Sequence, residues 1–175
     1  MNQLQIIVNT HNGINLSNIH NLVLGPNCQG FNYCKLVVQV DGTFLISRYQ
    51  RTLLTTLAQN GSRNIFPLAF AIVEGETKEA LIWFFQLLRE HVTPQSNLCL
   101  ITDKGKDILA ALQSEEVEWE ENGLQSVYCI RHIASNFNKK FKNHELKSRL
   151  KNMGNILFFH SPYYLFIENG IHKLN

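Results

Sequence analysis

Two short apolar runs that each end in an aspartate decide the fold: Leu36-Val37-Val38-Gln39-Val40-Asp41 and Leu98-Cys99-Leu100-Ile101-Thr102-Asp103. Short apolar runs without helical spacing predict β-strands, and the second run is typical of a strand buried on both faces. We expect Asp41 to end the first strand, before a turn at Gly42-Thr43. Asp103 is expected to end the later strand in the same way.

The residues between the two runs predict a meander and a helix. β-rich runs lie at 53–57 and 66–73, on either side of the turn-forming Asn60-Gly61-Ser62, so the first three strands are expected to be antiparallel. An amphipathic helix is expected from an N-cap at Thr77 to about Val92.

After Asp103 the pattern predicts a second helix over about 105–113, a short strand at 126–129 and a third helix from 130, whose apolar stripe is Ile130, Ile133, Ala134, Phe137 and Phe141. The whole order is that of an RNase H-like core, an α/β fold with a mixed sheet of about five strands flanked by helices. The first and fourth strands are neighbours in this layout, so Asp41 and Asp103 are expected to face one another.

The bulk composition is that of one soluble globular domain. The chain has 175 residues, of which 45% are hydrophobic and 17% charged. No secretory leader and no membrane-length apolar run is present, so we expect an intracellular protein whose cysteines stay reduced. The expected domain spans 31–154, preceded by a lead-in of unspecified structure at 1–30 and followed by a divergent tail at 155–175.

Charged residues are concentrated in two segments. The run at 115–121 holds five glutamates in seven residues and predicts a solvated loop or helix face. Seven Lys or Arg against one acid occupy 131–151. Within that segment Lys139, Lys140 and Lys142 are candidates for contact with DNA phosphates, although lysines on an exposed helix face serve equally well for solubility alone.

The pair Asp41 and Asp103 points to metal chemistry. Two carboxylates about 4 Å apart repel by roughly 4 kcal/mol at an effective dielectric of 20, so keeping both ionised requires a cation. Hard oxygen ligands suit Mg²⁺ or Mn²⁺, which serve phosphoryl transfer. The structural alternative is that Asp41-Gly42 is only a turn and Asp103 only the N-cap of the next helix.

The residues around the two aspartates favour the metal interpretation. The chain resembles Mutator-like element (MULE) transposases from about Gly30 to Gly154, in segments that include Asp41-Gly42-Thr43-Phe44-Leu45, Phe66-Pro67-Leu68-Ala69-Phe70, Leu100-Ile101-Thr102-Asp103 and Tyr128-Cys129-Ile130-Arg131-His132. This resemblance implies a DDE-type enzyme, in which two aspartates and a distal glutamate bind divalent metal and drive DNA strand cleavage and transfer.

Asp41 and Asp103 match the first two acids of that family, so the resemblance makes them catalytic and metal-binding residues for Mg²⁺ or Mn²⁺. The partner implied is DNA at transposon ends, in the nucleus, with no membrane or small-molecule substrate; a homo-oligomer is compatible with the family. The arginine and histidine that follow the second aspartate in the family are Lys104 and Gly105 here.

Cys129 and His132 match a Cys-x-x-His element of the family. Structural zinc takes four ligands, and no second Cys or His pair with suitable spacing is visible, so zinc is not expected. We interpret the two side chains instead as packing or hydrogen-bonding beside the active centre.

The third acid of the family is not identifiable. Structural explanations suffice for the acids nearest the expected site, which are Glu74, Glu76, Glu79 and Asp107. The family pattern ends after Gly154, and Glu168 has none of the expected surrounding motif. The sequence therefore predicts part of a transposase catalytic domain that does not cleave DNA efficiently by itself; the alternative is a non-catalytic, transposase-derived DNA-binding or transcription-regulatory protein.

Overall fold

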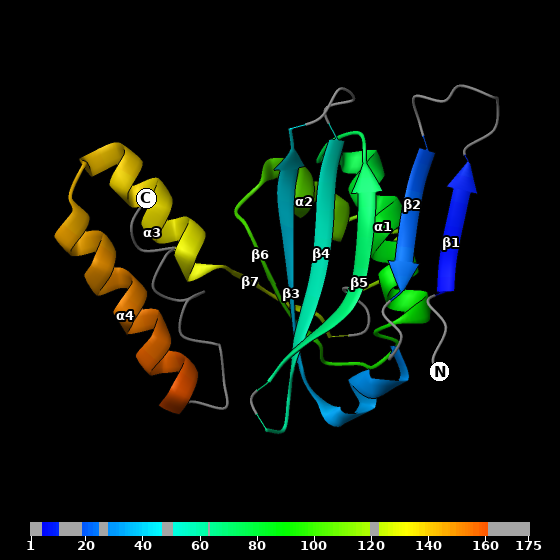
Figure 1. Ribbon diagram of the computed structural model, residues 1–175, viewed down its shortest axis with the longest axis horizontal. Coiled ribbons are helices and arrows are strands. Elements are labelled where there is room, and N and C mark those ends of the chain that lie inside the picture. The colour runs from blue at the N-terminus through cyan, green and yellow to red at the C-terminus, as the bar shows by residue number, and fades with distance from the viewer. Residues whose placement is uncertain are drawn as a thin grey trace.

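The computed structural model describes residues 5–10, 19–24, 28–46, 51–62, 64–119 and 123–160, with side chains described from Gly30 to Met153 inside these ranges. A seven-stranded mixed sheet forms the centre of the molecule, in the order β1-β2-β5-β4-β3-β6-β7 (Figure 1). Its strands are β1 (Gln5–Thr10), β2 (Ile19–Leu24), β3 (Cys34–Leu45), β4 (Arg51–Asn60), β5 (Ile65–Val73), β6 (Cys99–Thr102) and β7 (Gln125–Tyr128).

The five strands from β3 to β7 have the RNase H-like arrangement. β3, β4 and β5 form an antiparallel meander, whereas β6 pairs with β3, and β7 with β6, in parallel. Parallel neighbours need a crossover, and helices α1 (Lys78–His91) and α2 (Lys106–Leu112) supply these crossovers on one face of the sheet (Figure 1). The expected fold class is therefore confirmed.

The sheet is wider than expected, because β1 and β2 lengthen it beyond β5. β2 pairs antiparallel with β5 over 21–24, and β1 pairs with β2 along its whole length. The sequence predicts no specified structure for segment 1–30. Its uncharged apolar stretches at 6–8 and 22–24 supply the strand-forming residues, which the frequent asparagines around them obscure.

The expected turn at Gly42-Thr43 is wrong. β3 continues to Leu45, and Asp41, Gly42 and Thr43 pair with Thr55, Leu54 and Leu53 of β4. Asp41 therefore lies inside a strand and not at its end. The turn signal of an Asp-Gly pair is local, and the ladder with β4 overrides it by satisfying the backbone hydrogen bonds on that side.

The predicted helices agree closely with the structure. The Thr77 side chain caps α1 by accepting a hydrogen bond from the backbone N–H of Ala80 at 3.2 Å. α1 buries Phe84, Phe85 and Leu88 completely against the sheet. The expected third helix is α3 (Ile130–Phe141), and α4 (His144–His160) follows it; the two lie side by side beyond the β7 edge (Figure 1).

The acidic loop after α2 is anchored by two apolar residues. Glu115, Glu116 and Glu118 are exposed, as expected of the acidic run, but Val117 and Trp119 between them are only 1% and 2% exposed. The ring of Trp119 lies 5.5 Å from that of Phe85. Alternation of acidic and apolar residues thus fastens the loop to α1.

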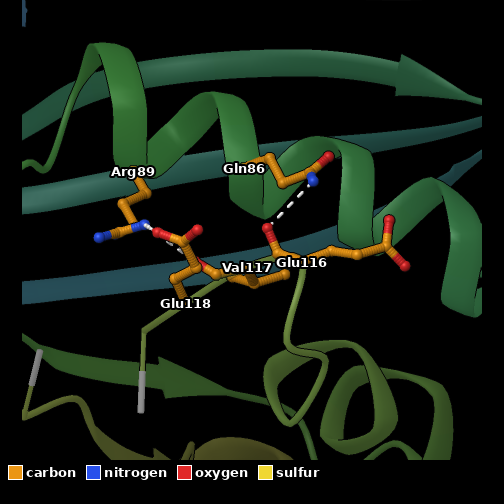
Figure 2. Close-up of polar contacts among 5 residues, drawn as sticks. All are labelled: Gln86, Arg89, Glu116, Val117 and Glu118. Atoms are coloured by element: carbon orange, nitrogen blue, oxygen red, sulfur yellow. Dashed lines mark hydrogen bonds and ion pairs between the residues drawn. The ribbon is translucent and has the colours of Figure 1, made fainter. Parts of the chain in front are cut away.

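Polar groups of α1 hold the backbone of the same loop (Figure 2). The Gln86 amide donates to the carbonyl of Glu116 at 3.0 Å, and Arg89 donates to the carbonyl of Val117 at 3.4 Å. Arg89 also pairs with the Glu118 carboxylate at 2.8 Å. The Val117 carbonyl is partly buried, so the bond from Arg89 avoids the cost of leaving it unpaired.

We expect Trp119→Ala to destabilise the fold by about 3–5 kcal/mol, because it removes a buried aromatic ring and leaves a cavity against Phe85. Urea unfolding measures the loss. The matched control is Glu118→Gln in the same loop, which removes an exposed ion pair worth less than about 1 kcal/mol. Equal losses in the two variants would show that the loop does not depend on its apolar anchors.

Candidate metal and nucleic-acid site

The parallel pairing of β3 with β6 sets the two aspartates opposite one another. Val38 pairs with Leu100, and Gln39 pairs with Ile101. Asp41 and Asp103 are each two residues beyond the last pair, so they occupy matching positions on strands that lie about 4.8 Å apart. Both residues line one small pocket, together with His132.

His132 lies between the two carboxylates. Its Nε2 is 3.6 Å from Asp41 Oδ1, and its Nδ1 is 3.9 Å from Asp103 Oδ1. These side chains are between a third and a half exposed, so solvent reaches them. The imidazole therefore spaces the two acids, and it adds a positive charge between them when it is protonated.

Neither structural alternative for the aspartates holds. Asp41 is not in a turn, and the N-cap of α2 is Gly105 instead of Asp103. The Asp103 Oδ1 atom accepts a hydrogen bond from the backbone N–H of Lys104 at 2.6 Å, and the backbone carbonyl of Asp41 accepts one from the Thr55 hydroxyl at 3.3 Å. These bonds hold the acid-bearing segments in place and leave both carboxylates facing the pocket.

Cys129 fixes the start of α3 beside the acids. It is the N-cap residue, it is 7% exposed, and its backbone N–H donates to the Thr102 carbonyl at 2.7 Å. The next turn of the helix then carries His132 toward the pocket, since residues i and i+3 share a helix face. Cys129 itself lines a neighbouring pocket with Asp41 and His132.

Glu76 lines the same pocket as Asp41 and Asp103, although the sequence analysis gave it only a structural explanation. It lies between β5 and α1, and its side chain reaches the Asp41–Asp103 pocket. Burial of its carboxyl group raises the pKa of Glu76; the charges of Asp103 and Asp41 raise it further, and His132 lowers it. The residue as a whole is exposed, so it is the carboxyl end that enters the pocket.

Strand direction is the signal that could have found Glu76. β5 runs parallel to β3, because each is antiparallel to β4. The loop after β5 therefore emerges at the sheet edge toward which β3 runs, the edge that carries Asp41. An acid in that loop is a candidate for the same site, whereas Glu79 and Asp107 remain exposed in first turns of helices.

The donor set suits a hard divalent cation. Asp41, Asp103 and Glu76 offer carboxylate oxygens, which are the ligands that Mg²⁺ and Mn²⁺ prefer. As the side chains stand, no group of three or more His, Cys, Asp or Glu within the described ranges is placed to hold a metal ion. The acids share a pocket, but they do not converge on one point.

A basic pocket adjoins the acidic one. It is lined by Gln39, Asp41, Cys129, Arg131, His132, Ser135, Lys147 and Lys151, so α3 and α4 both contribute to it. The three cations come from the Arg131–Lys151 segment singled out by its charge. Lys139, Lys140 and Lys142 are exposed near the end of α3 instead, and they do not line this pocket.

The core therefore has the RNase H-like arrangement that the sequence predicted, with Asp41 inside β3 and Asp103 directly after β6. Residues 37–136 match the family model of the MULE transposase domain, over more than half of the chain. The chain therefore belongs to the MULE transposase domain family. The match contains Asp41, Asp103, Cys129 and His132. No curated protein matches the chain.

Within the described residues, no helix has the length and apolar character needed to cross a membrane.

The raised pKa of Glu76 predicts a pH-dependent cost to stability. The folded chain keeps the Glu76 carboxyl group protonated to higher pH than the unfolded chain does. The stability that the protonated group contributes is therefore present in full below the ordinary pKa of a glutamate, and it is lost as pH rises through the raised pKa. Glu76→Gln should therefore be more stable than the parent at pH 7, and the difference should vanish near pH 4. Urea unfolding across this range, with exposed Glu79→Gln as the control, measures the effect.

Proposed function

We propose that Asp41 and Asp103 are the metal-binding, catalytic aspartates of a DDE-type DNA strand-transfer site. The observation that carries this proposal is that Asp41 in β3 and Asp103 directly after β6 lie at matching positions beyond the last paired residues, with one imidazole near both carboxylates. Family membership supports it, because both acids lie inside the matched region.

Each residue of the pocket has a distinct task in this proposal. Asp41 and Asp103 would hold Mg²⁺ or Mn²⁺, which when bound supplies activation of the attacking oxygen and stabilisation of the leaving oxygen. His132 would be a positioning residue, because its imidazole lies between the two carboxylates, 3.6 Å from Asp41 Oδ1 and 3.9 Å from Asp103 Oδ1. Cys129 positions His132 by tying the start of α3 to the end of β6.

The basic pocket supports DNA as the partner. Arg131, Lys147 and Lys151 share a pocket wall with Asp41, so a phosphate held there would lie next to the acidic centre. Phosphate contacts of this kind are independent of base sequence and weaken with salt. Lys139, Lys140 and Lys142 would extend the same basic surface along α3, and a nuclear location accords with this partner.

Metal titration tests the first part. Asp41→Asn and Asp103→Asn should each weaken Mn²⁺ binding by about tenfold or more, or roughly 1.4 kcal/mol, because each removes a charged oxygen ligand. Asp107→Asn, an exposed acid in the first turn of α2, is the control and should bind as the parent does. Unchanged binding in both site variants would mean that these acids serve structure alone.

Charge reversal tests the DNA surface. Lys147→Glu with Lys151→Glu should reduce DNA affinity at low salt, and the slope of log affinity against log salt should fall by about one for each lysine–phosphate interaction that the change removes. Lys139→Glu with Lys140→Glu makes the same change in charge outside the pocket. If both pairs weaken binding equally, the pocket has no special part in it; if neither does, the lysines only aid solubility.

We expect inefficient strand cleavage, because the acids within the described ranges do not surround one metal ion and cleavage requires ligands that position both reacting oxygens. Supercoiled DNA incubated with Mn²⁺ should therefore stay mostly intact. Efficient nicking that is lost in both Asp41→Ala and Asp103→Ala would contradict this expectation, while supporting the assignment of the two aspartates.

A further inference from the structure

We infer that Glu76 supplies a third carboxylate to the divalent-metal pocket formed by Asp41 and Asp103. The inference rests on the proposed function of that pocket and adds a ligand to it that lies outside the two-aspartate motif.

The Glu76 carboxyl group lies over Gly42, the residue next to Asp41. A Cβ atom built at Gly42 would overlap Glu76 Oε1, and it would come within 2.8 Å of Glu76 Cδ. The carboxyl group therefore lies directly over Gly42, and a Cβ atom there would displace it from this position. Glycine at this point of β3 thus leaves space for an acid from another loop beside Asp41.

The second support is the electrostatic neighbourhood of the group. Glu76 lines the same pocket as Asp41, Asp103 and His132. Three carboxylates in one pocket repel one another, and a bound cation relieves this repulsion. A carboxylate with a purely structural role would be stabilised by a cationic partner, whereas two acidic neighbours destabilise its charge.

The third support is a buried hydroxyl in the wall of the pocket. Thr102 is fully buried at 0% exposure, it lines this pocket, and its Oγ1 has no hydrogen-bond partner among the described residues. A buried hydroxyl without a partner costs free energy, so such groups in a pocket point to a polar ligand or its water shell. This observation is independent of the acids.

The separation of the acids is consistent with this role. The three carboxylates do not surround a metal ion as they stand, and Mg²⁺ keeps several of its waters when one or two carboxylates hold it. The Glu76 side chain has several rotatable bonds and its carboxyl group already lies in the pocket, so its carboxylate can reach the ion directly or through one of these waters.

Mn²⁺ titration of the full chain at pH 7, followed by the electron paramagnetic resonance signal of free Mn²⁺, tests the inference without any need for activity. Glu76→Gln should weaken binding by about tenfold, the range found when a supporting metal-site contact is removed. Glu79→Gln removes the same charge three residues away, from an exposed position in the first turn of α1, and should leave binding unchanged.

A second variant keeps the test independent of the charge change. Gly42→Ala displaces the Glu76 carboxyl group and should also weaken Mn²⁺ binding, whereas the same substitution in a Glu76→Ala background should add little. Circular dichroism of each variant checks that the fold is kept.

The outcomes separate the two proposals. If Asp41→Asn weakens Mn²⁺ binding and Glu76→Gln does not, the aspartate site stands and Glu76 is not part of it. If Glu79→Gln weakens binding as much as Glu76→Gln, only the overall charge matters and the inference is overturned. If none of these variants alters binding, the metal site itself is wrong.

Discussion

The parallel pairing of β3 with β6 is the constraint on which the site depends. Its register, Gln39 opposite Ile101, brings together two aspartates that are 62 residues apart in the sequence. The intervening chain forms β4, β5 and α1, and these elements are what carry the backbone from one strand to its parallel neighbour. A slip of one residue would turn one acid to the opposite face of the sheet, since side chains alternate along a strand.

Packing of the hydrophobic core stabilises this strand register. Val38 and Leu100, which are paired in the ladder, are both completely buried, and α1 covers the same sheet with buried aromatic rings. Trp119 extends that packing to the loop before β7. Repositioning either strand would therefore open cavities in the core, so the acids inherit their geometry from apolar packing.

Opposite charges lie side by side at the carboxyl ends of the core strands. The acidic pocket contains Asp41, Asp103 and Glu76, and the pocket next to it carries the cations of α3 and α4. This layout suits a polyanionic substrate: the basic wall attracts phosphates, while the acids repel them unless a cation is present. Under the proposed function, metal binding would thus be a condition for DNA to enter the acidic pocket, and not only for chemistry.

The sequence by itself determined the order of the core elements, because apolar periodicity, the Thr77 cap and the turn at Asn60-Gly61 are local properties of the chain. It also predicted the family, which the family model confirms, and it put forward Asp41 and Asp103 as site residues, since these motif residues adjoin strands that periodicity already identified. Only the tertiary structure decided that Asp41 lies within a strand and that β1 and β2 widen the sheet. It also decided that Glu76 reaches the acidic pocket, and that Lys139 and Lys140 lie outside the basic pocket next to it. The physical reason is that strand pairing and the meeting of distant loops depend on contacts between residues far apart in the chain, which no local pattern records.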